Sequence, residues 1–89
     1  MVRVVFTPHL ERHVQCPSQD VQGESVKEVL EAAFQANSKA RSYILDDQGA
    51  VRKHVAIFVN GTLLNDRTHL SDPVPPGGEV YVMQALSGG

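Results

Sequence analysis

His54-Val55-Ala56-Ile57-Phe58-Val59-Asn60-Gly61 is the segment of this sequence most diagnostic of its fold. Apolar side chains recur at alternate positions from Val55 to Val59, which is the period of a strand with one buried face. Asn60-Gly61 follows directly, and this dipeptide is the strongest short signal for a tight hairpin turn. Residues 62–64 are therefore expected to return as a second strand.

Further alternating segments lie at the two ends of the chain. Residues 1–7 place valine and phenylalanine on one face of a predicted first strand, and residues 79–85 form a predicted last strand. Residues 10–16 alternate again and are predicted to form a hairpin with the first strand, whereas residues 17–24 are polar and are predicted as turn. The first and last strands are expected to be neighbours in the centre of one sheet.

The middle of the chain changes to the period of a helix. Ser25 followed by Glu28 is a capping box, in which each side chain accepts a hydrogen bond from a free backbone N–H. The apolar residues that recur at helical spacing are Val26, Val29, Leu30, Ala33 and Phe34. The helix is expected to end near Asn37-Ser38, because asparagine tolerates the left-handed conformation that closes a helix.

The remaining segments are predicted as short strand pieces and turns. Tyr43-Ile44-Leu45 is interpreted as a strand piece, Asp46–Gly49 as a turn, and residues 66–78 as an irregular connection rich in proline. The simplest packing is an α+β fold in which one main helix lies across a mixed sheet of four or five strands. We expect this domain to span residues 1–85, with residues 86–89 as a flexible tail.

Length and composition restrict the class of protein. The chain has 89 residues, of which 42% are hydrophobic and 20% charged, as in a single globular domain. It lacks a run of ~18 apolar residues and a secretory signal, which favours the cytoplasm and no membrane partner. The single cysteine, Cys16, cannot form an internal disulfide. A net charge of −2 without a basic block argues against nucleic-acid binding.

The usual catalytic and metal-binding patterns are weak. The four histidines are scattered, so no metal site is expected; they are His9, His13, His54 and His69. Cys16 falls on the inward face of its predicted strand, where a small buried hydrophobe is the favoured role. Asp46-Asp47 and Gly77-Gly78 are explained as turn residues.

The C-terminal residues Leu86-Ser87-Gly88-Gly89 are the unusual feature that is left. Two glycines without Cβ atoms can thread a channel too narrow for side chains, and the reactive group of such a tail is its terminal carboxylate. A carboxylate becomes an acylating agent once it is converted to a mixed anhydride, which requires a partner enzyme that holds ATP and magnesium. The alternative is a frayed end without a role.

Three segments in this order resemble the ThiS/MoaD family of ubiquitin-like β-grasp sulfur carriers. They are Leu45–Val55, Ile57–Gly61, and the stretch from Pro76 to Gly89 that ends in Ser-Gly-Gly. The resemblance covers nearly the whole chain. It departs from the family just before the two glycines, where many relatives have Pro-Ala-Val-Ala and this chain has Gln84-Ala85-Leu86-Ser87.

The resemblance implies a carrier that is not itself an enzyme and binds no cofactor. An E1-like enzyme would adenylate the carboxylate of Gly89, using its own ATP and magnesium, and convert it to a thiocarboxylate. The thiocarboxylate would then give its sulfur to an acceptor enzyme that makes a cofactor, cysteine or a specialised metabolite. Gly88 matches the family's tail, and the free protein is expected to be a monomer.

Strand alternation adds a docking face to this expectation. If the valines of the last strand point inward, Tyr81 and Met83 point outward, and Phe58 lies outward beside them. Large apolar groups on an exposed sheet face are typical of a protein contact, so these residues, with Leu86 and Ser87 of the tail, are predicted to bind the partner.

Two other functions start from the same C-terminal glycine. The chain could be a ubiquitin-like modifier that forms isopeptide bonds to lysine, or the small subunit of a complex like molybdopterin synthase. The residues also leave open which pathway receives the sulfur, and whether the native chain continues beyond Gly89 and is trimmed.

Overall fold

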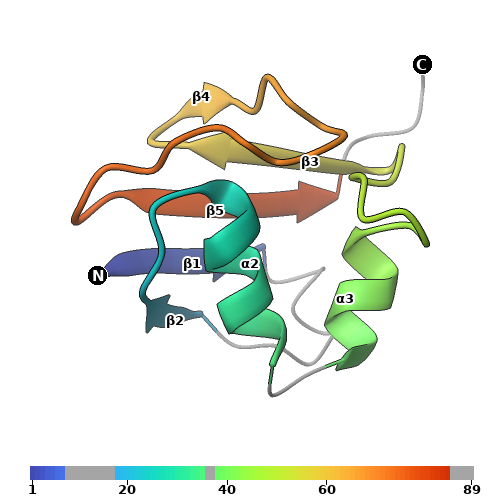
Figure 1. The fold of residues 1–89 in the computed structure, drawn as a ribbon, viewed down its shortest axis with the longest axis horizontal. Coiled ribbons are helices and arrows are strands. Elements are labelled where there is room, and N and C mark those ends of the chain that lie inside the picture. The colour runs from blue at the N-terminus through green and yellow to red at the C-terminus, as the bar shows by residue number, and fades with distance from the viewer. Residues whose placement is uncertain (8–17, 36–37, 85–89) are drawn as a thin grey trace.

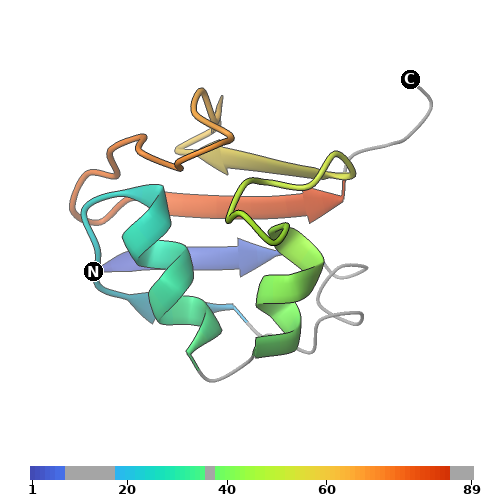
Figure 2. The same cartoon turned by 45° about the vertical axis from the view of Figure 1, so that its right-hand side comes forward.

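A computed structural model describes residues 1–7, 18–35 and 38–84 (Figure 1). Its elements are β1 (Val2–Phe6), β2 (Gln19–Val21), α2 (Val26–Phe34), α3 (Ser38–Ile44), β3 (Val55–Val59), β4 (Thr62–Leu63) and β5 (Glu79–Gln84). The strands form one mixed sheet in the order β2-β1-β5-β3-β4. Both helices cover the same face of this sheet (Figure 2). In the described part of the chain, no helix is long and apolar enough to cross a bilayer.

The first and last strands lie side by side in the centre of the sheet, as the sequence predicts. β1 and β5 are parallel, with Val4 opposite Val80 and Phe6 opposite Val82. Two further hydrogen bonds extend this pairing: Arg3 N–H donates to the O atom of Gly78, the residue before β5, at 3.0 Å, and the N–H of Thr7, the residue after β1, donates to Val82 O at 3.1 Å. The central pair therefore joins the beginning and the end of the described chain.

The β3–β4 hairpin confirms the expectation from Asn60-Gly61. Both residues have positive φ, 49° and 85°, as the tight turn requires. The turn pairs Phe58 with Leu63 and Val59 with Thr62. Asn60 also fastens the turn to β5, because its Oδ1 accepts a hydrogen bond from Glu79 N–H at 2.9 Å.

The hydrophobic core lies between the sheet and the helices. Val59 is partly buried, and the other strand residues expected to face the helix are buried: Val2, Val4, Phe6, Val55, Ile57, Val80 and Val82. All five residues predicted for the apolar stripe of α2 are buried beneath them. Burial on this scale is the main favourable term in the folding of a domain of this size.

The capping box at the start of α2 is present with one change of partner. Glu28 N–H donates to Ser25 Oγ at 3.3 Å, as predicted. The Glu28 carboxylate accepts from Glu24 N–H at 3.1 Å, one residue before the expected donor. The first bond satisfies an N–H group that the helix itself leaves free, and the second fixes the residue before the N-cap.

Two predictions about local structure were wrong. Residues 19–21, expected as turn, form strand β2, which pairs antiparallel with β1. Hydrogen bonding to β1 stabilises the strand conformation of this short polar segment, so the segment forms a strand without an alternating apolar pattern of its own. Tyr43-Ile44-Leu45 was expected as a strand piece, but residues 38–44 form a second helix. Ala40 and Ile44 are buried at a spacing of four residues, which is the helical spacing.

The N-terminal hairpin predicted for residues 10–16, including Cys16, lies outside the described residues, as does Asn37. The helix was expected to end near Asn37-Ser38, but α2 ends at Phe34 and Ser38 begins α3. The expected turn at Asp46–Gly49 is confirmed. Asp46 Oδ1 accepts hydrogen bonds from Gln48 N–H at 2.8 Å and Ala50 N–H at 3.0 Å, and Gly49 has a φ of 85°. Gly77, with a φ of 76°, likewise occupies a turn.

Candidate functional site

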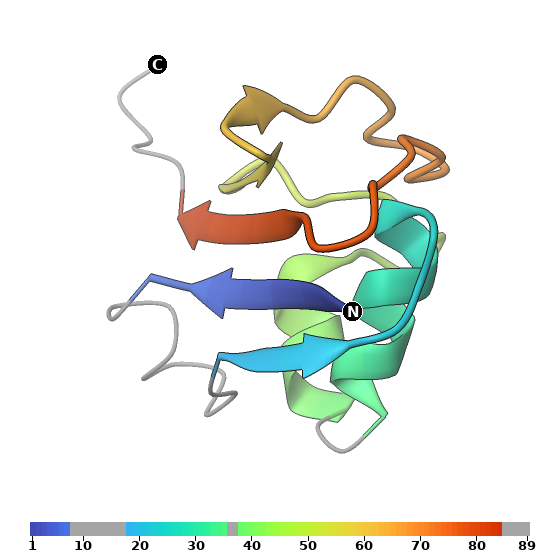
Figure 3. The same cartoon turned by 90° about the vertical axis from the view of Figure 1, so that its left-hand side faces the viewer.

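Both helices lie on one face of the sheet (Figure 3). The opposite face carries the side chains that alternate with the core residues of the strands. Tyr81 and Met83 alternate with the buried Val80 and Val82, so they point away from the helices. The strand register then places outward residues of four strands side by side: Tyr81 is opposite Val5 and Phe58, Phe58 is opposite Leu63, and Met83 is opposite Ala56. We call these six residues the outer patch: Val5, Ala56, Phe58, Leu63, Tyr81 and Met83.

The outer patch is partly open to solvent. Leu63 is 53% exposed, and Phe58, Tyr81 and Met83 are half-buried. Directly opposite side chains on neighbouring strands lie close enough to form one continuous surface. The patch therefore offers a partner apolar area on a rigid support.

The structure brings together the three patch residues expected from the sequence, Phe58, Tyr81 and Met83. Sequence reasoning missed Val5, Ala56 and Leu63. A two-residue turn at Asn60-Gly61 puts Leu63 opposite Phe58, so this residue could have been found from the register. Val5 and Ala56 each fall between two inward residues of their strands and could have been found from the alternation.

The outer patch leads toward the C-terminal residues. Met83 is next to Gln84, the last residue that the structure describes, and Gln84 pairs with Val55 at the start of β3. Leu86, Ser87, Gly88 and Gly89, predicted as the reactive tail, lie outside the described residues. Gln84 itself turns inward with Val55, and its Oε1 is buried without a hydrogen-bond partner among the described residues.

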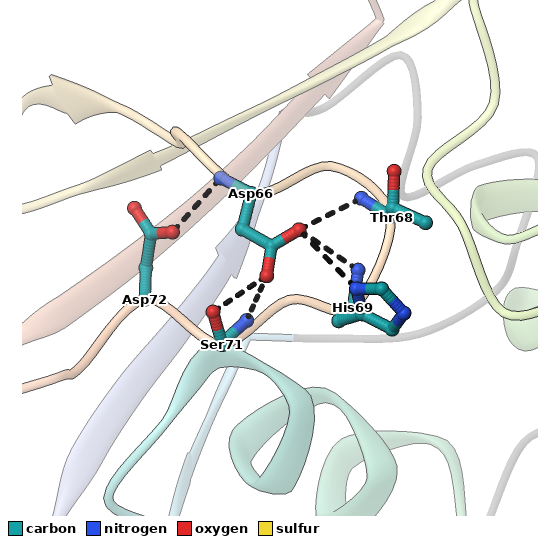
Figure 4. A network of polar contacts seen from close by, with 5 residues as sticks. All are labelled: Asp66, Thr68, His69, Ser71 and Asp72. Carbon is teal, nitrogen blue, oxygen red and sulfur yellow. Dashed lines mark hydrogen bonds and ion pairs between the residues drawn. The ribbon is translucent and has the colours of Figure 1, made fainter.

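A network of hydrogen bonds orders the loop of residues 65–72, which is part of the connection between β4 and β5 (Figure 4). Asp66 Oδ1 accepts from the backbone N–H groups of Thr68 at 3.2 Å and His69 at 2.9 Å, and its Oδ2 accepts from Ser71. Asp72 in turn accepts from Asp66 N–H at 2.9 Å. The two carboxylates therefore fix the backbone of the loop by accepting hydrogen bonds from its N–H groups. Within the described ranges, no group of three or more metal-ligating side chains could hold a metal ion.

We expect Asp66 to make the stability of the protein depend on acid pH. Its hydrogen bonds, the one from the Ser71 side chain foremost, lower its pKa from 3.8 to about 2. A carboxyl whose folded pKa is depressed contributes stability that is complete above the unfolded pKa and is lost as pH falls through the folded one. The free energy of unfolding of the wild type should therefore fall between about pH 4 and about pH 2.

Asp66→Asn should remove this part of the pH dependence, because the amide does not titrate. Urea unfolding of both proteins across that interval measures the difference. Asp47→Asn, an exposed turn residue, is the matched control and should keep the wild-type slope. An unchanged slope in Asp66→Asn would contradict the assignment.

The order of strands, with parallel β1 and β5 at the centre and helices on one face, defines the ubiquitin-like β-grasp fold. A model of the ThiS family matches residues 11–89, and the chain belongs to that family. Its expected resemblance to the ThiS/MoaD carriers is thereby confirmed.

Solved structures with the same fold span nearly the whole chain. A chain of the BexX/CysO complex of Amycolatopsis orientalis is 18% identical over 100% of each chain, with a TM-score of 0.82. CysO of Mycobacterium tuberculosis is 20% identical over 97% of this chain and 100% of its own, with a TM-score of 0.81. SAMP1 of Haloferax volcanii is 22% identical over 99% and 98%, with a TM-score of 0.75. A search of curated proteins found no match.

Proposed function

We propose that this protein is a sulfur carrier whose C-terminal Gly89 is activated by a partner enzyme. Membership of the ThiS family supports the proposal, because the family match runs to Gly89. The single observation that carries it further is the outer patch, an apolar surface across four strands that extends along β5 toward the C-terminal residues.

The proposed chemistry needs one group from this chain. A carboxylate oxygen of Gly89 attacks the α-phosphorus of ATP on the E1-like partner, and pyrophosphate leaves. Hydrosulfide (HS⁻) from the partner's sulfur supply then attacks the acyl carbon, AMP leaves with the C–O bond electrons, and loss of the S–H proton leaves a thiocarboxylate. The partner supplies ATP and magnesium, and this chain is the substrate, with no catalytic group of its own. The thiocarboxylate then passes its sulfur to a biosynthetic acceptor enzyme in the cytoplasm.

The fold would serve this reaction in two ways: it would bind the partner enzyme, and it would place the C-terminal carboxylate in the partner's active site. The outer patch would bind the partner, while Leu86 and Ser87 would carry Gly88 and Gly89 into its active site. Glycines lack a Cβ, so they fit a narrow channel and let the carboxylate approach the nucleotide closely. Binding energy from the patch would hold the carboxylate in position, as remote contacts of a substrate do.

We expect truncation of the patch to weaken binding of the activating enzyme. Phe58→Ala and Tyr81→Ala should each raise the Kd roughly 30-fold, because central aromatic residues of an interface cost about 2 kcal/mol or more when truncated. Isothermal titration calorimetry with the purified partner measures the effect.

Lys39→Ala is the control for this experiment, since Lys39 is exposed on α3, on the opposite side of the sheet. It should bind like the wild type. Circular dichroism of each variant checks that the fold is kept. If the patch variants bind within about threefold of the wild type, a difference under 1 kcal/mol, the docking face lies elsewhere.

A protein modifier is the second candidate, favoured by the likeness to small archaeal modifier protein 1. Both functions begin with the same acyl adenylate and differ in the nucleophile that follows. Cell extract separates them: higher-mass conjugates that disappear when Gly88 and Gly89 are deleted indicate a modifier. Co-purification of a stoichiometric large subunit would instead indicate a permanent small subunit.

A further inference from the structure

A cleft of about 230 Å³ opens on the helical side of the molecule, away from the outer patch. Its walls come from segments far apart in the sequence: Lys27 from α2, Arg41 from α3, Gln48 from the turn after α3, and Thr68 and His69 from the loop before β5. The proposed sulfur-carrier function uses none of these residues.

Three polar side chains around the cleft have no partner among the residues that the structure describes. In the described part of the chain, the side chains of Lys27, Arg41 and Thr68 take part in none of the ion pairs or hydrogen bonds, although the chain as a whole has a net charge of −2. His69 adds an exposed imidazole, whose Nδ1 is 4.0 Å from Asp66 Oδ1. Glu31 is the one acidic residue of the lining. Two permanent positive charges thus face one negative charge.

The floor of the cleft is apolar and fixed in place. It contains Leu45 and Leu70, which are 4% and 2% exposed. Leu70 has a φ of 56°, a conformation that residues other than glycine seldom adopt. Two hydrogen bonds of 3.0 Å hold it there, from Leu70 N–H to Asp66 O and from Lys27 N–H to Leu70 O. The second bond joins the start of α2 to the loop, so Lys27 and Thr68 stay on adjoining walls.

We propose that this cleft binds the phosphoryl group of a small phosphate monoester. Guanidinium, ammonium and hydroxyl groups are the donors that recognise phosphate oxygens in proteins. The volume is below the ~300–1,000 Å³ typical of sites for drug-sized ligands, so it suits a phosphoryl group with a short organic part. The organic part contacts Leu45 and Leu70. This inference does not depend on the function of the C-terminus.

Titration of the full chain with phenyl phosphate, followed by ¹H–¹⁵N NMR, tests the proposal. We expect saturable shifts confined to the amides of residues 27–31, 41–49 and 68–70. Inorganic phosphate should bind more weakly, because it lacks the apolar part. Benzoate, which has the ring and a single negative charge, should bind more weakly still.

Charge variants make the test specific. Lys27→Gln and Arg41→Gln should each weaken phenyl phosphate binding by about three- to tenfold, the loss of one charge-assisted hydrogen bond at an exposed site. Glu31→Gln should tighten it. Lys53→Gln, an equal change of charge at an exposed residue outside the cleft, is the control and should bind like the wild type. Because the substituted side chains are exposed, all four variants should fold, which the dispersion of their spectra confirms.

Three results would overturn the proposal. The first is a set of shifts that are not saturable or are spread over the surface. The second is benzoate binding as tight as that of phenyl phosphate, which would show that no phosphoryl group is recognised. The third is that Lys53→Gln weakens phenyl phosphate binding as much as Lys27→Gln and Arg41→Gln do, which would show that the effect depends only on the net charge of the protein.

Discussion

A chain that lacks Gly89 should form neither an adenylate nor a thiocarboxylate when it is incubated with its activating enzyme, ATP and magnesium. The deletion moves the carboxylate to Gly88 and shortens the chain by about 3.3–3.6 Å. Misplacement of a reacting group by ~1 Å can already cost 10²-fold in rate, so the product should fall below detection. Release of AMP or pyrophosphate and the intact mass of the protein are the measurements.

Binding of the same deletion variant separates reaction from recognition. Because the outer patch is untouched, the variant should still bind the partner, and it should inhibit activation of the intact chain. Phe58→Ala should behave in the opposite way: it should bind the partner weakly, but its Gly89 should still be adenylated when the variant is present at high concentration. Activation of the deletion variant at the wild-type rate would contradict the role of Gly89.

Phe34→Ala should lower the free energy of unfolding by ~3–5 kcal/mol, the usual cost of removing a buried phenylalanine. Phe34 is 4% exposed at the end of α2, and its ring centroid lies 6.5 Å from that of Phe6 in β1. It therefore joins the helix to the central strand pair. For a domain whose whole stability is of order 5–15 kcal/mol, this loss is large.

Denaturant unfolding of Phe34→Ala, Phe34→Leu and Gln35→Ala measures the effect. Phe34→Leu keeps most of the apolar volume and should lose less than the alanine variant. Gln35 is the exposed neighbour of Phe34, and Gln35→Ala should stay within about 0.5 kcal/mol of the wild type. A loss below about 1 kcal/mol in Phe34→Ala would mean that this ring does not join helix and sheet as described.

The segments with a strong apolar period could be predicted from the sequence. Alternation in β1, β3 and β5 and the helical stripe of α2 reflect burial against the same core, so local pattern and tertiary structure agree there. The turn at Asn60-Gly61 could be predicted because it requires positive φ at both positions.

β2 and α3 could not be predicted, because neighbouring elements determine them. β2 has three residues, of which Val21 alone is buried, and its strand conformation comes from pairing with β1. α3 buries Ala40 and Ile44, too few residues to distinguish a helix from a strand in a short apolar run.

The candidate sites divide in the same way. Phe58, Tyr81 and Met83 follow from alternation within single strands, whereas Leu63 joins them through the register between strands. The cleft near Lys27 and Arg41 has no local signature, because its residues meet only once both helices and two loops have packed.

Intact-mass analysis of the chain, purified after expression with its activating enzyme and a sulfur source, tests the central claim most directly. We expect the mass change that corresponds to replacement of one oxygen by sulfur, located by fragmentation at Gly89 and dependent on ATP. An unchanged mass in the presence of the active partner, or sulfur added at Cys16 instead of replacing oxygen at Gly89, would contradict the carrier function.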